Sequence, residues 1–128
     1  MSSTFKMAIM AGFVALLMIL SVSLAEAQFM AGYELVQTWE EYKRINEGTV
    51  EEGDAWLGSL FMGYVTGVCD AIGNLFELPS TVTVGQICSV VGKYLDGHPE
   101  RCNEPAFGLV LSAMIEAFPK RRMAPMDG

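Results

Sequence analysis

The sequence predicts an all-α fold, a small four-helix domain with short loops. Four stretches carry apolar side chains at the three- and four-residue spacing that marks one face of a helix. Glycine or proline stands near the end of each stretch, and both residues commonly end helices. Segments that alternate apolar and polar residues between turn dipeptides, as strands do, are lacking.

The first 27 residues predict a secretory signal peptide. Lys6 precedes an apolar run over residues 7–20, and Ala25 and Ala27 supply the small side chains of a cleavage site. The run is shorter than the roughly 20 apolar residues that a helix needs to cross a bilayer, which argues against a membrane anchor. We therefore expect cleavage after Ala27, and no second segment that spans a membrane.

The remainder is long enough for one compact domain, which we expect over residues 28–119, with a flexible tail over residues 120–128. The net charge of −7 is unchanged by loss of the signal peptide, because that segment holds one lysine and one glutamate. An acidic body repels nucleic acid phosphates and anionic lipid headgroups. We expect no nucleic acid partner, no membrane contact after signal cleavage, and a partner with a basic surface.

The first two helices of the domain are expected over residues 32–46 and 54–76. Gly48 should stop the first, and Asp54 can cap the second at its N-terminus. The second helix contains several glycines, each of which lowers helix propensity by up to about 1 kcal/mol relative to alanine. We interpret Gly63 and Gly67 as positions where another backbone approaches closely.

The last two helices follow an exposed loop. Thr83 can cap a helix over residues 84–95, with Gly97 in a left-handed conformation at its end. Asn103 can cap the final helix, with Pro105 in its first turn. Pro119 should end that helix.

Residues suited to catalysis or metal binding are few. The only histidine, His98, lies in a Gly-His-Pro turn, and Cys69 and Cys88 fall on or beside apolar stripes, where thiols are usually inert. Asp70 could form a structural ion pair with Lys93 or Arg101. Neither a CxxC pair nor a zinc-type Cys/His spacing occurs, so we expect no catalytic set, metal or cofactor, and by elimination a binding protein that is not an enzyme.

A series of short sequence motifs then stands out for its order and spacing. They are Gly63-Tyr64, Gly67-Val68, Asp70-Ala71, Pro79, Val82-Thr83, Gln86, Lys93-Tyr94-Leu95, His98-Pro99-Glu100, Pro105-Ala106 and Ala117-Phe118-Pro119. Over about residues 33–119 the chain resembles the Rap/Tai immunity proteins, periplasmic partners of type VI secretion amidase effectors. We interpret the motifs themselves as structural, that is, as residues that support the fold.

The resemblance implies an all-helical, often dimeric periplasmic domain without chemistry of its own. It would bind a papain-like peptidoglycan amidase, an enzyme with a Cys-His pair, and block the active cleft. Many proteins can share a fold without sharing a partner. The alternative is therefore a non-enzymatic periplasmic helical module that binds a small apolar ligand or an envelope protein, with a small secreted enzyme as a remote third reading.

The cysteines depart from the family pattern. Where relatives commonly carry cysteine, this chain has Trp39, Phe61 or Met62, Glu77 or Leu78, and Lys120. The usual disulfides should therefore be absent together. A replacement bridge from Cys69 to Cys88 would contribute roughly 2–4 kcal/mol. The other reading is three reduced, buried thiols.

For the partner-binding site, we expect an exposed loop carried on rigid helices. The loop consists of Glu77, Leu78, Pro79, Ser80 and Thr81. Secondary surfaces are the acidic connector Glu51-Glu52 and the turn over residues 96–98.

Overall fold

The computed structural model describes residues 2–22, 29–49 and 54–122. It contains the helices α1 (Ser3–Val22), α2 (Gly32–Glu47), α3 (Asp54–Ile72), α4 (Val84–Gly97) and α5 (Ala106–Ala117), and the 3-10 turns η1 (Gly73–Leu75) and η2 (Pro99–Arg101). These described ranges form no strand, and a single isolated bridge pairs Ala31 with Pro105. The all-α class is confirmed. The count of four helices is one short, because the N-terminal segment is helical too.

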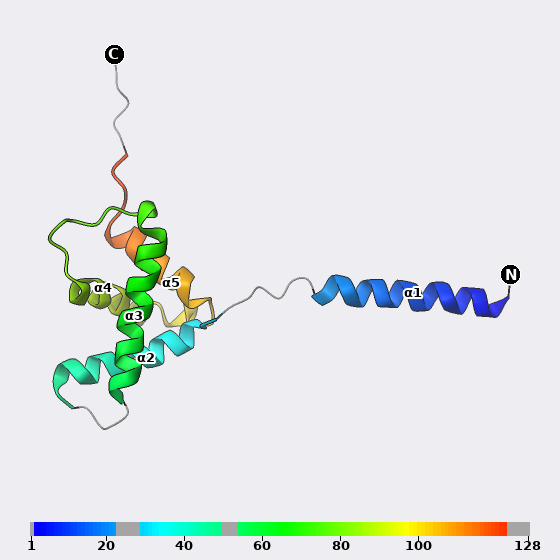
Figure 1. Cartoon of the computed structure of the whole chain (residues 1–128), viewed down its shortest axis with the longest axis horizontal. Helices are drawn as coiled ribbons and strands as arrows, with labels where there is room; N and C mark the ends of the chain where they lie inside the picture. Colours follow the sequence, from blue (N-terminus) through cyan, green and yellow to red (C-terminus); the bar gives the residue numbers. More distant parts are fainter. Residues whose placement is uncertain (1, 23–28, 50–53, 123–128) are drawn as a thin grey trace, which may run out of the picture.

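Helix α1 lies apart from the other four helices (Figure 1). Every side chain described in it, over residues 3–18, is exposed. The expected cleavage point after Ala27 lies outside the described residues.

Helices α2 to α5 enclose one core. The contact between α2 and α3 is the most extensive, and α3 runs across the front of the other helices in Figure 1. Each helix contributes fully buried side chains, among them Leu35, Phe61, Val91 and Leu109. Burying such a side chain stabilises the fold by roughly 1.5–3 kcal/mol. The core therefore accounts for the stability of the four-helix body.

Two predicted helix ends are confirmed. Gly48 ends α2 in the left-handed region, with φ of 73°. Thr83 starts α4 with a capping box: its Oγ1 accepts the Gln86 backbone N–H at 3.2 Å, and Gln86 Oε1 accepts the Thr83 backbone N–H at 2.8 Å. Helix α3 begins at Asp54, whose side chain lies outside the described residues.

Two other predicted ends are wrong. Gly97 is the last residue of α4 without a positive φ, and the chain leaves the helix at His98, whose Nδ1–H donates to the Tyr94 carbonyl at 2.8 Å. Helix α5 starts after Pro105 instead of Asn103. The reason is tertiary, because Gly32 N–H donates to the Glu104 carbonyl and Ala106 N–H donates to the Met30 carbonyl, which ties residues 104–106 to the start of α2.

The glycines that allow close packing are not those expected. Gly63 and Gly67 are exposed, and a β-carbon on either would meet nothing within 4 Å. A β-carbon at Gly58 would instead overlap Ile45 and lie 3.2 Å from Tyr42 Cα, so this is where α3 approaches α2. The expectation was wrong because sequence spacing does not reveal which face of α3 meets a neighbour.

Among the described residues, Ala55–Leu75 is long and apolar enough, by length and composition alone, to cross a membrane. The expectation that no second segment could do so is wrong on that measure. In this structure one face of the segment, which includes Phe61 and Val65, is buried in the core.

Candidate functional site

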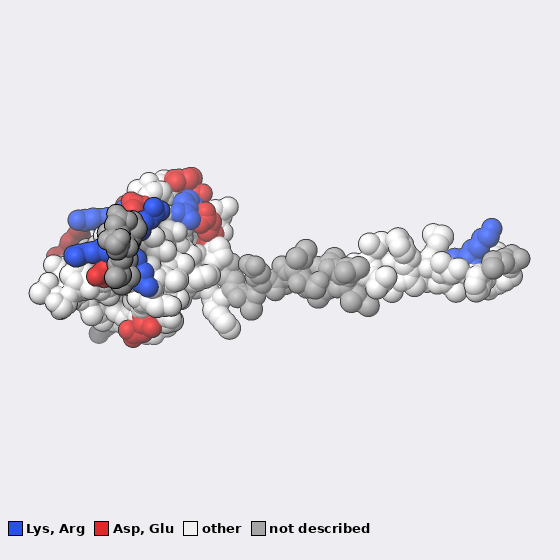
Figure 2. All heavy atoms as spheres, turned by 90° about the horizontal axis from the view of Figure 1, so that it is seen from above, with Lys and Arg blue, Asp and Glu red and all other residues white. Residues whose placement is uncertain are grey.

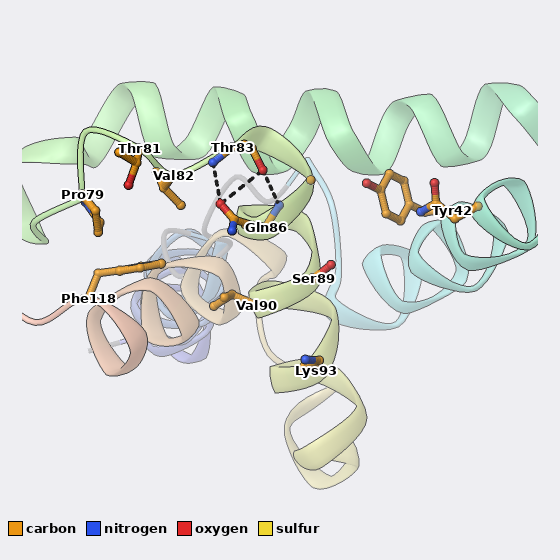
Figure 3. A pocket seen from close by; sticks show the side chains of 12 residues that line it. Tyr42, Pro79, Thr81, Val82, Thr83, Gln86, Ser89, Val90, Lys93 and Phe118 are labelled. Carbon is orange, nitrogen blue, oxygen red and sulfur yellow. Dashed lines mark hydrogen bonds between the residues drawn. The ribbon is translucent and has the colours of Figure 1, made fainter.

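A hollow of about 740 Å³ follows the outer face of α4 (Figure 3). We call it the α4 groove. Its floor is α4 from Gly85 to Lys93, and its walls come from the loop before α4, from the C-terminal part of α2, and from Phe118 after α5. Segments distant in the sequence therefore form one surface.

The two ends of the groove differ in chemistry. Pro79, Val82, Val90 and Phe118 form an apolar end. The other end is polar and is lined by side chains from α2 and α4, namely Tyr42, Asn46, Ser89 and Lys93. Such a mixed lining suits a protein segment, which carries both apolar side chains and hydrogen-bonding backbone.

The loop that forms one wall is held at both ends. At its start, Glu77 N–H donates to the Phe118 carbonyl at 3.0 Å, and the Glu77 carboxylate accepts the Arg121 backbone N–H at 3.4 Å. At its end, Val82 N–H donates to the Pro79 carbonyl at 3.1 Å, next to the capping box of α4. The loop is therefore fixed by hydrogen bonds at both ends in this structure.

The five predicted loop residues do not share one environment. Pro79 and Thr81 line the groove, and Leu78 packs against the core. Glu77 and Ser80 are exposed. The loop is thus part of the groove wall, and its role in binding stays a prediction.

The secondary surfaces fare differently. Glu51 and Glu52 lie outside the described residues. In the turn over residues 96–98, Asp96 accepts the Trp39 indole N–H at 3.1 Å, and the His98 ring stacks on Tyr94 with centroids 4.1 Å apart. The turn therefore contributes internal contacts.

The structure also separates seven of the motif residues, namely Gly63, Tyr64, Gly67, Asp70, Lys93, His98 and Pro99. Lys93 lines the α4 groove, whereas Gly63, Tyr64 and Gly67 line an apolar groove of about 400 Å³ beside Phe107. Burial raises the pKa of Tyr64. Pro99 begins η2 directly after His98.

The predicted ion pair of Asp70 is wrong. Asp70 is exposed, and among the described residues it has no salt bridge to Lys93 or Arg101. Arg101 instead pairs with Glu104 at 2.7 Å and donates to the Tyr94 hydroxyl. The Arg101 hydrogen bond lowers the pKa of Glu104. Arg101 pairs with Glu104 and not with Asp70 because Arg101 and Glu104 lie in the same turn.

Sequence reasoning did not identify the floor of the groove as a site. Gln86 was named from the sequence only as one of the family motifs, and Ser89 and Val90 were not singled out. Their only signal is that residues 86, 89, 90 and 93 share one side of a helix. That spacing is typical of any solvated helix face, so only the walls show that these residues form a groove.

The two buried cysteines, Cys69 and Cys88, provide no activated thiolate. All three are free, and burial raises the pKa of Cys69 to about 11. Burial also raises the pKa of Cys88, partly offset by a hydrogen bond with the Tyr42 hydroxyl. A thiol with a raised pKa is a poor nucleophile at neutral pH. The Cys69–Cys88 bridge is not formed in this structure and stays a prediction.

Charge on the body is mixed. Acidic and basic side chains are interspersed on the face seen in Figure 2. Among the described residues that line the α4 groove, Lys93 is the only charged one. Within the described ranges, no three His, Cys, Asp or Glu side chains are grouped so that they could hold a metal ion.

The comparison with known families covers most of this body. A profile of the family described as Rap1a immunity proteins matches residues 31–119, the region from α2 to the end of α5 that contains the groove and its loop. No curated protein and no solved structure matches the chain. The chain belongs to the Rap1a immunity protein family.

Proposed function

We propose that this protein is a periplasmic immunity protein that binds a secreted peptidoglycan amidase and inhibits it by blocking the active cleft. The family match over residues 31–119 is the observation that carries this proposal. Membership implies an immunity protein against secreted effectors, and the family is generally non-enzymatic. The amidase, the cleft and the periplasm follow from the resemblance and the N-terminal apolar segment.

The described chemistry supports inhibition by binding. His98 Nδ1–H donates to the Tyr94 carbonyl, and the two rings stack. Cys69 and Cys88 are buried with raised pKa values. A general base and a nucleophile must lie within hydrogen-bond reach of each other, and these side chains have other partners or are inaccessible.

The loop and the α4 groove form the surface that we assign to the effector. The loop is hydrogen-bonded at both ends, so binding costs little conformational entropy there. The net charge of −7 attracts a basic enzyme over long range. A rigid loop beside a groove can occupy a cleft and grip its rim.

Calorimetry with the amidase encoded nearest the gene tests this function, using the protein purified from cells that express the whole chain. We expect tight binding, with Kd on the order of nanomolar, and loss of peptidoglycan hydrolysis in the mixture. Charge reversal at Glu77 should weaken binding, whereas charge reversal at Asp70, which is exposed on α3 and lines none of the described hollows, is the matched control. Full hydrolysis in the presence of excess protein would rule out immunity against that enzyme.

The resemblance also leads us to propose a homodimer. Sedimentation equilibrium of the purified protein decides this, and a mass that stays monomeric at high concentration would contradict it. The alternative of a small apolar ligand gains less support, because the α4 groove is open and half polar.

A further inference from the structure

We propose that the α4 groove binds a protein segment that carries an apolar side chain and, two residues further on, a carboxylate. This inference deepens the proposed function, on which it rests, by giving the chemistry of the effector segment. It follows from the donors, the charge and the spacing of the side chains that line the groove.

The polar side chains of the groove floor offer donors. Gln86, Ser89 and Lys93 follow each other at three- and four-residue steps and so share one face of α4. Gln86 Oε1 already accepts from the Thr83 backbone N–H and faces Thr83 Oγ1 at 3.3 Å, which leaves its amide N–H groups for a ligand. Such a row of donors is complementary to backbone carbonyls and a carboxylate.

Lys93 fixes where the carboxylate should lie. Among the Lys and Arg residues of α2 to α5 it is the one without a salt bridge to a described residue, since Lys43, Arg44 and Arg101 each pair with a nearby glutamate. Of the described residues in the groove lining, Lys93 is also the only charged one. An anionic group is therefore the complement of this site, even though the whole chain is acidic.

The distance along α4 gives the spacing within the partner. Val90, at the apolar end, lies three residues before Lys93, a separation of about 4.5 Å along the axis, and the flexible four-carbon stem of lysine can extend this span. In an extended segment, side chains on the same side are two residues and roughly 6.6 Å apart. If an apolar residue of the partner segment contacts Val90, Val82 and Phe118, the residue two positions later in that segment thus lies at Lys93.

A neighbouring hollow limits the register. Val90 and Lys93 also line a cavity of about 320 Å³ that continues along α4 toward Tyr94 and His98. Glu116 lines that cavity. A carboxylate placed beyond Lys93 would approach Glu116 and be repelled, so Lys93 is the favoured position.

The inference can be tested without knowing the effector. Two probes, acetyl-Phe-Ser-Glu-amide and acetyl-Phe-Ser-Gln-amide, are titrated into isotope-labelled protein purified from cells that express the whole chain, and backbone amide shifts are followed by NMR. We expect the shifts to be concentrated over residues 83–93, with the Glu peptide bound about threefold more tightly, as an exposed ion pair allows. K93M should erase that difference, K93R should restore it, and K120M, outside the groove, should retain it.

Three results overturn the inference. Equal affinity for the two peptides indicates a purely apolar site, and shifts outside residues 83–93, or no shifts up to about 10 mM peptide, show that the groove does not bind the peptide even with roughly millimolar affinity. Shifts of residues 83–93 that depend on protein concentration alone assign the groove to a second copy. Unchanged thermal unfolding of K93M excludes a folding defect as the cause.

A parallel titration with the amidase separates this inference from the proposed function. K93E should weaken effector binding at least about tenfold and K120E less than about twofold, as expected for a desolvated ion pair against a surface charge. Binding that K93E leaves intact overturns the groove while immunity stands. Absence of binding by the unaltered protein ends the amidase proposal, and the peptide titration then decides the groove by itself.

Discussion

Trp39 packs directly against Gly92, and its indole N–H donates to Asp96 at 3.1 Å. A β-carbon at Gly92 would overlap the ring, so α2 and α4 approach each other at this point because residue 92 has no side chain. Lys43 lies over the same ring, 5.3 Å from its centroid. The contact joins two helices that also form the polar end of the α4 groove.

Gly92→Ala should therefore destabilise the fold by about 1–3 kcal/mol, because the added methyl group must displace the Trp39 ring. Urea unfolding followed by circular dichroism measures the change. Gly85→Ala, in the same helix but facing open space, is the control and should lose little or nothing. Equal stability of the two variants would show that the ring can move aside freely.

Gly67→Ala should stabilise the protein by roughly 0.5–1 kcal/mol. The position lies inside α3 with nothing within 4 Å of an added β-carbon, so the variant gains helix propensity without a clash. Thermal unfolding gives the readout, and Gly58→Ala serves as the contrasting variant because its β-carbon would overlap Ile45. A destabilised Gly67→Ala would indicate that this face packs against something in solution.

Thr83→Ala should cost about 1 kcal/mol, because the Gln86 backbone N–H loses its acceptor at the start of α4. Thr83→Ser keeps the hydroxyl and should retain most of the stability. Urea unfolding of the pair isolates the cap. If the serine variant is as unstable as the alanine variant, the methyl group of Thr83, and not its oxygen, holds the helix start.

Stability should fall in alkali through the buried thiols. Burial raises the pKa of Cys69 from its ordinary value of 9.0 to about 11, so the folded state favours the neutral thiol. This stabilisation is fully present below pH 9 and is lost as the pH rises from 9 to 11, since the unfolded chain then releases its proton first.

This effect is measured by comparing the unfolding free energies of the unaltered protein and of Cys69→Ala between about pH 8 and about pH 11. This range spans the shift of the pKa from 9.0 to about 11. The alanine variant should lose stability less steeply with pH. Identical slopes would show that Cys69 does not contribute. A Cys69–Cys88 bridge in solution would instead make the slope of the variant the steeper one, because Cys88 would become a free buried thiol, and thiol titration under denaturing conditions detects such a bridge.

Features set by neighbours along the chain were predictable from sequence. The helix stop at Gly48 and the N-terminal cap at Thr83 depend on residues within one turn, and both are confirmed. The all-α class was predictable for the same reason, because apolar spacing reports local periodicity. The loop was also located, although only Pro79 and Thr81 of its five residues line the groove.

Features set by partners far along the chain were not predictable. The start of α5 depends on Gly32 donating to the Glu104 carbonyl, and the close approaches fall at Gly58 and Gly92 because Ile45 and Trp39 lie opposite them. The α4 groove exists only where α2, α4, the loop and Phe118 meet. The sequence by itself determined the helices and the motifs of the family. Tertiary structure decided which helix faces meet, since packing selects contacts by shape across large sequence separations, which no local pattern records.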